Sequence, residues 1–146
     1  MTEEEFRNYL HSAKRCKKEI NSLRQSWKAL EVEFLDFTSA GAMDYSVDRV
    51  QSSSEPDALL INAIDRVSEK RHKILLRIEE LQKQIDDIEG TIDTVEDSIC
   101  HEIMRLYYIE DVRMMDIADR LSFSEQRIWQ LWRKGIEEAY SNIRVN

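Results

Sequence analysis

The chain has 146 residues, of which 34% are charged, with 29 acidic against 21 basic residues and a formal net charge of −8 at pH 7. Only three glycines and one proline occur, too few for glycine-rich phosphate cradles, turn-rich β-sandwiches or proline-rich disorder. At 42% hydrophobic residues the chain can bury a core, and the scarcity of helix breakers predicts an all-α protein with one domain or two small ones.

The composition also argues against a membrane, secretory or metal-binding protein. No apolar run approaches the roughly 18 residues that a membrane span needs, and the acidic N-terminus argues against a signal or transit peptide. Cys16 and Cys100 lie far apart and neither has a CxxC partner, as in reduced cytoplasmic proteins. Since His11, His72 and His101 do not complete a ligand motif, we expect both cysteines to be buried and no metal or cofactor to bind.

The first predicted element is a long helix. From residue 6 to residue 37 the apolar positions step alternately by three and four residues, a heptad seam that must pack against another helix. Its members are Phe6, Tyr9, Ala13, Cys16, Ile20, Leu23, Trp27, Leu30, Phe34 and Phe37. Residues 38–56 lack this period and hold Gly41, several serines and the only proline, so they predict a long loop that is partly disordered or functional.

A second seam starts after Asp57 and predicts a second long helix. Its members are Leu60, Ile64, Val67, Arg71, Ile74, Ile78, Leu81, Ile85, Ile88, Ile92, Val95 and Ile99. Because the two seams share one period and must bury each other, they predict a long antiparallel coiled-coil hairpin over residues 1–96, within one chain or between two. We expect self-association into a homodimer.

After Ile99 the apolar period changes register, and residues 97–146 predict a separate domain of short helices, with Asp97 as a cap at its start. The first short helix ends near Ile109, and the second covers Met114–Leu121. A break at residues 122–123 follows, and Ser124 is the expected N-cap of the last helix.

A short helix, a turn of three or four residues and a second helix with a polar outer face form a helix-turn-helix. Arg, Gln and Glu are the side chains that recognise base edges in the major groove, while Arg and Lys also bind phosphates. The candidate DNA-binding residues are Ser124, Glu125, Gln126, Arg127, Trp129, Gln130, Arg133 and Lys134, together with Arg113 before the first of the two helices. From spacing alone, the same polar residues equally suit a helix face that only contacts water.

Three segments resemble a known family: YYIED at 107–111, DIADRL at 116–121 and FSEQRI at 123–128. They are similar to the run RYIEG…EEIAERLGYSERTV of the DNA-binding fourth domain of bacterial sigma factors. The whole chain resembles the phage-encoded regulators of the ArpU/RinA kind, which have an N-terminal helical region, a loop similar to residues 45–52, a long helix and a C-terminal helix-turn-helix. The resemblance implies control of phage transcription in a bacterial cytoplasm, with double-stranded DNA and the host RNA polymerase as partners.

The chain departs from this family pattern at three positions. Asp111 and Ser122 stand where the family has glycine, and Arg113 stands where a Ser or Thr cap is usual. If the backbone at Ser122 needs a positive φ, the missing glycine costs about 1 kcal/mol.

Two function classes remain. The sequence has no HExxH, GxSxG or Walker motif, so we expect no enzymatic activity and no catalytic residue. In the first class, the protein is a transcription regulator. Residues 122–134 carry three basic side chains and one acidic side chain, Glu125, so one copy neutralises few DNA phosphates. Tight binding to DNA would therefore need a second copy of the chain or RNA polymerase as a partner. In the second, it is a coiled-coil scaffold whose C-terminal bundle docks a protein, with Trp129 as an anchor and an acidic surface that repels nucleic acid.

Overall fold

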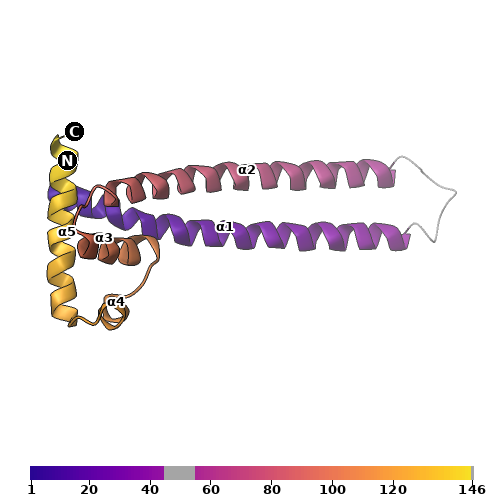
Figure 1. Ribbon diagram of the computed structural model, residues 1–146. Helices are drawn as coiled ribbons and strands as arrows, with labels where there is room; N and C mark the ends of the chain where they lie inside the picture. The colour runs from indigo at the N-terminus through magenta and orange to yellow at the C-terminus, as the bar shows by residue number, and fades with distance from the viewer. Residues whose placement is uncertain (45–54, 146) are drawn as a thin grey trace. The chain divides into compact units, whose positions relative to one another are not determined.

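The computed structural model describes the backbone of residues 1–44 and 55–145, and the side chains of residues 1–36 and 57–145. Over these residues the protein is all-α and has no strand, which confirms the predicted class (Figure 1). The elements are α1 (Glu3–Asp44), α2 (Glu55–Ile92), α3 (Ser98–Met104), the π-helical segment η1 (Arg105–Ile109), α4 (Met114–Leu121) and α5 (Glu125–Val145). Within this described part, no helix combines the length and the apolar character needed to cross a membrane.

Helices α1 and α2 form the predicted antiparallel hairpin. The Cys16 thiol donates a hydrogen bond to Gln84 Oε1 at 3.2 Å, and Arg66 Nη2 lies 3.1 Å from Glu33 Oε1. As residue numbers rise along α1, their partners on α2 fall. This order identifies the pairing as antiparallel, because a parallel pair would make both numbers rise together.

Most residues of the two seams are buried or half-buried, as the heptad period predicted. The fully or nearly fully buried members are Phe6, Ala13, Cys16, Ile20, Leu30, Val67, Leu81, Ile85, Ile88, Ile92 and Val95. Ile64 and Ile99 are exceptions, with 40% and 42% of their surfaces exposed. Phe37 lies outside the described side chains.

The one charged seam residue, Arg71, also faces α1. Its guanidinium carbon lies 5.0 Å from the centre of the Trp27 ring, and its Nη2 is 3.8 Å from Glu31 Oε1. A cation placed over an aromatic face keeps both its charge and its packing. Arg71 therefore keeps the heptad position with its charge paired to Glu31, while its buried Nε has no hydrogen-bond partner.

The loop between the two long helices is shorter than predicted at both ends. Residues 38–44 continue α1 through Gly41, since a single glycine costs a helix only about 1 kcal/mol. At the other end α2 begins at Glu55, and Pro56 occupies its first turn, where a missing N–H group breaks no intrahelical bond. The rest of the predicted loop, residues 45–54, lies outside the described residues.

The second long helix ends earlier than the seam predicted. It stops at Ile92, and a turn follows in which Val95 N donates to Ile92 O at 3.0 Å. Asp97 then caps α3, its Oδ1 accepting from the backbone N–H groups of Ile99 and Cys100 at 3.0 Å each. The predicted cap is confirmed, while Ile99 was wrongly assigned to the seam because it belongs to the new helix and points to solvent.

Contacts divide the chain into two compact units. One, here called the terminal unit, combines residues 1–19 with 81–146; the other, the hairpin unit, comprises residues 20–80. In the terminal unit the start of α1 lies against α5: Tyr140 Oη donates to Met1 O at 2.7 Å, and the Phe6 and Tyr140 rings are 5.5 Å apart. The functional division at residues 96/97 stays a prediction, but the C-terminal helices share their core with the first turns of α1.

Close approach of α3 and α5 completes that core. Gly135 of α5 is buried, and a Cβ atom placed there would lie 2.7 Å from Met104 Sδ and 3.4 Å from Cys100 Cβ. A larger residue at this position would require the Met104 side chain to move. Around this contact the terminal unit buries Phe6, Leu10, Ile88, Ile92, Ile103, Tyr108, Ile117, Ile128 and Ile136.

Candidate nucleic-acid interface

The turn between α4 and α5 lies where the sequence predicted the break of a helix-turn-helix. Helix α4 ends at Leu121, and Ser122 adopts a left-handed conformation with φ 59° and ψ 38°. Ser124 Oγ then accepts a hydrogen bond from Arg127 N at 3.1 Å, so Ser124 is the N-cap of α5. The break and the cap inferred from the sequence are both confirmed.

Asp111, in the segment before α4, has the same kind of backbone, with φ 54°. Within the described ranges, Asp111 and Ser122 are the non-glycine residues with positive φ. They are also the two positions at which the similar sigma-factor run carries glycine. Both turns thus demand a conformation that glycine adopts most easily, although this chain supplies other residues.

Replacing Ser122 by glycine is expected to stabilise the protein by about 1 kcal/mol, because glycine adopts the left-handed conformation without a Cβ clash. Urea unfolding followed by circular dichroism measures the change. Ser141, exposed within α5, provides the matched control: Ser141→Gly should destabilise by about 0.5 kcal/mol, since glycine weakens a helix interior. An unchanged or lower stability of Ser122→Gly contradicts strain at this turn.

The outer face of α5, defined here by Gln126, Gln130 and Arg133, is exposed to solvent. Among the described residues, the side chains of Gln126 and Arg133 have no hydrogen-bond or ion-pair partner. Arg127, at the edge of this face, donates from Nη1 to Gln130 Oε1 at 3.3 Å. At the other end, Lys134 Nζ lies 3.6 Å from Asp97 Oδ2. The helix therefore presents amide and guanidinium groups that remain available to a ligand.

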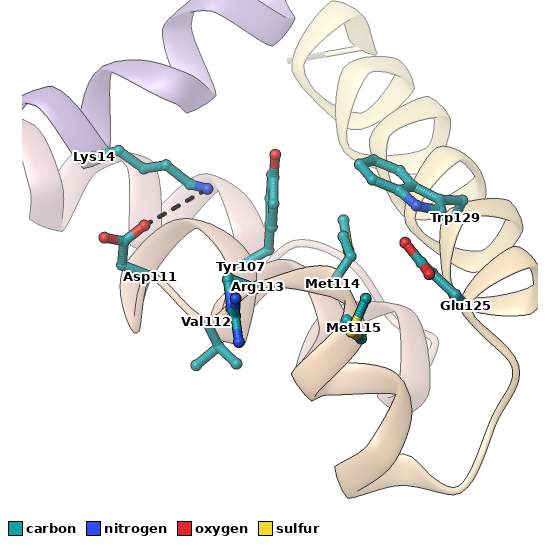
Figure 2. Close-up of a pocket in the computed structure, with 9 residues that line it drawn as sticks. All are labelled: Lys14, Tyr107, Asp111, Val112, Arg113, Met114, Met115, Glu125 and Trp129. Carbon is teal, nitrogen blue, oxygen red and sulfur yellow. Dashed lines mark ion pairs between the residues drawn. The ribbon is translucent and has the colours of Figure 1, made fainter.

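Three of the predicted site residues, Arg113, Glu125 and Trp129, line a pocket. Figure 2 shows Glu125, Arg113 and Trp129 around this pocket. The pocket has a volume of about 390 Å³. The remaining lining residues are Lys14, Tyr107, Asp111, Val112, Met114 and Met115. Arg113 bonds through Nε to Asp116 Oδ2 at 3.0 Å and keeps 80% of its side chain exposed. On α5, Trp129 follows Gln126 by three residues and precedes Arg133 by four, so the pocket adjoins the outer face.

Trp129 and Glu125 line the pocket from α5. The Trp129 ring centre lies 5.3 Å from that of Trp132 and 6.2 Å from that of Tyr107, both in edge-on arrangements. Trp132 is buried and donates from Nε1 to Tyr108 Oη at 3.1 Å. Trp129 is thus packed on one side and 39% exposed on the other.

Lys14 enters the pocket from α1 and was not predicted as a site residue. Its Nζ lies 3.5 Å from the centre of the Tyr107 ring and 3.6 Å from Asp111 Oδ1. Burial lowers the pKa of Lys14 from its usual value, and the neighbouring Asp111 opposes that change. Burial raises the pKa of Tyr107, and the negative charge of Asp111 raises it further. No local sequence signal connects Lys14 to residues so far along the chain.

Metal-binding side chains do not gather in the described part of the chain. No group of three His, Cys, Asp or Glu residues is placed to hold a metal ion there. Both cysteines are buried, as expected, and burial raises the pKa of the Cys100 thiol to about 11. Cys100 is therefore a thiol rather than a thiolate at neutral pH.

Comparison of the chain with known protein families, with characterised proteins and with solved structures found no significant match.

Proposed function

We propose that the protein is a sequence-specific transcription regulator that binds double-stranded DNA through the major groove with the first turns of α5. The observation that carries this proposal is a helix-turn-helix whose second helix is capped by Ser124 and exposes Gln126, Gln130 and Arg133. Glutamine pairs with adenine and arginine with guanine through two hydrogen bonds each, so these side chains can discriminate bases.

The roles of the basic residues follow from their positions along α5. Arg127 lies in the first turn beside Gln130 and is proposed to contact a base edge. Arg133 and Lys134 lie farther along the helix and are proposed to contact phosphates. Because one copy offers few such contacts, tight binding in this proposal uses a homodimer or an RNA polymerase partner. A phage-encoded regulator acting in a bacterial cytoplasm agrees with the resemblance of residues 107–128.

Two alanine variants separate base recognition from phosphate binding. Arg127→Ala is expected to cost about 1–3 kcal/mol of binding and to relax the base preference at one position of the site. Lys134→Ala is expected to weaken all sequences alike and to reduce the salt dependence. The measurement is a selection of bound genomic fragments, followed by titrations of one selected site at several salt concentrations. Thermal unfolding of both variants controls for loss of the Lys134–Asp97 pair.

A wild-type protein that shows no sequence preference at moderate salt rules this proposal out. The second candidate function, protein docking by the terminal unit, would then gain support. One observation favours it: the pocket wall exposes 58% of Met115 and 39% of Trp129, both of which are side chains that anchor protein interfaces.

A further inference from the structure

The pocket of the terminal unit contains one carboxylate that has no partner. Glu125 is exposed at the start of α5, and no other described residue forms a hydrogen bond or an ion pair with its side chain. Lys14 Nζ lies 3.6 Å from Asp111 Oδ1, so these two lining charges offset each other. Arg113 Nε donates to Asp116 Oδ2 at 3.0 Å. The pocket therefore offers one uncompensated negative charge.

Aromatic and sulfur-containing side chains surround this carboxylate. Tyr107, Trp129 and two methionines line the same pocket. Trp129 meets the Tyr107 and Trp132 rings at interplanar angles of 69° and 84°, so neither neighbour stacks flat on it. Aromatic faces attract cations, and Lys14 Nζ at 3.5 Å from the centre of the Tyr107 ring shows this attraction within the pocket itself. The pocket thus combines aromatic surface with negative charge, the two features that bind a cation.

The cation already present lies at the other end of the pocket from Glu125. Figure 2 shows Lys14 and Asp111 on one side of the pocket, and Glu125 with Trp129 on the other. Lys14 therefore satisfies Asp111 and leaves Glu125 without a counter-charge. The volume of about 390 Å³ lies within the range of about 300–1,000 Å³ that is typical of ligand pockets, so a second group has room beside Glu125.

The charge of Glu125 restricts what can fill the pocket. An apolar occupant would cover the carboxylate without giving it a partner, which costs free energy. An anion would be repelled by Glu125 and would compete with the carboxylates that already pair the two basic lining residues. A guanidinium group avoids both penalties, because it stacks on an aromatic ring and donates two parallel N–H bonds to a carboxylate. An ammonium group supplies only a point charge.

We infer that this pocket binds an arginine side chain of a partner protein, with the guanidinium group between Glu125 and Trp129. Met115 is 58% exposed beside it and can contact the residues that flank such an arginine. Tryptophan, methionine and arginine are all enriched at protein interfaces, which favours a protein as the source of the guanidinium group. The inference goes beyond DNA binding and is tested without DNA, so its failure leaves the proposed function unchanged.

Amide-capped amino acids test the occupant on the full-length protein. N-acetyl-arginine amide is expected to shift the Trp129 indole N–H signal and the Glu125 amide signal saturably in two-dimensional NMR spectra. The neutral isostere N-acetyl-citrulline amide and the corresponding lysine derivative should each bind about fivefold or more weakly. Equal binding of the arginine and citrulline derivatives would overturn the inference. Free arginine that binds about tenfold more tightly than the capped form would identify a small-molecule site and overturn the protein source.

Two glutamine variants test the carboxylate. Glu125→Gln is expected to weaken binding of N-acetyl-arginine amide by about fivefold or more, because it keeps the shape of the side chain and removes its charge. Glu137→Gln is the matched control, since Glu137 is exposed on the same helix about three turns farther along and does not line the pocket. Equal weakening by both variants would show that only the net charge matters and would contradict a specific site. Thermal unfolding checks that both variants stay folded.

Discussion

Replacing Ile85 by aspartate is expected to remove about 4 kcal/mol or more of stability. Ile85 is 4% exposed and lies one residue from Gln84, whose side chain bonds to Cys16 across the hairpin. The substitution deletes a buried aliphatic group and leaves a carboxylate without water or a partner. Since small proteins are stable by only about 5–15 kcal/mol, much of the cooperative transition should be lost. Urea unfolding followed by helical circular dichroism measures this, and Leu81→Asp, at 2% exposure, should behave alike.

Leu59→Asp separates burial from the effect of a new charge on α2. The side chain of Leu59 is 61% exposed, so the same kind of substitution should change the free energy of unfolding by about 0.5 kcal/mol or less. Similar losses at Ile85 and Leu59 would contradict the burial pattern of the hairpin.

A fragment of residues 96–146 is expected to lack a cooperative unfolding transition, although it contains the whole helix-turn-helix. The fragment loses Phe6 and Leu10, which are fully buried, and the Met1 carbonyl that accepts from Tyr140. It also loses His11, whose ring meets the Tyr107 and Tyr108 rings edge-on at 6.0 and 5.4 Å. A hydrophobic core of this size is only marginally stable, so loss of the α1 residues that cover it should abolish cooperative folding. Near-ultraviolet circular dichroism and thermal scans report the loss.

Adding back the first part of α1, residues 1–19, should restore the fold. A chain that joins residues 1–19 to residues 81–146 by a short Gly-Ser turn retains the complete terminal unit without the hairpin unit. We expect a cooperative transition for this chain and, if the proposed function is right, the base preference of the full protein. A cooperative transition in the 96–146 fragment alone would show instead that α1 adds little to the C-terminal core.

Local features of this protein were determined by the sequence itself. The caps at Asp97 and Ser124, the bounds of α4 and the break at Ser122 depend on hydrogen bonds and backbone preferences within a few residues. The heptad period likewise specified which side of each long helix is buried, because side-chain direction repeats with the helical turn. These features were predictable since the residues that decide them are neighbours along the chain.

Only the tertiary structure decided which distant residues share the terminal unit. The packing of α1 on α5, and the position of Lys14 between Tyr107 and Asp111, join residues that no periodic pattern relates. The same packing turned Trp129 and Glu125 toward a pocket and left Gln126 and Arg133 on the outer face of α5. A helical period gives the direction of a side chain about its own axis, but the neighbour it meets depends on how separate helices fill space together.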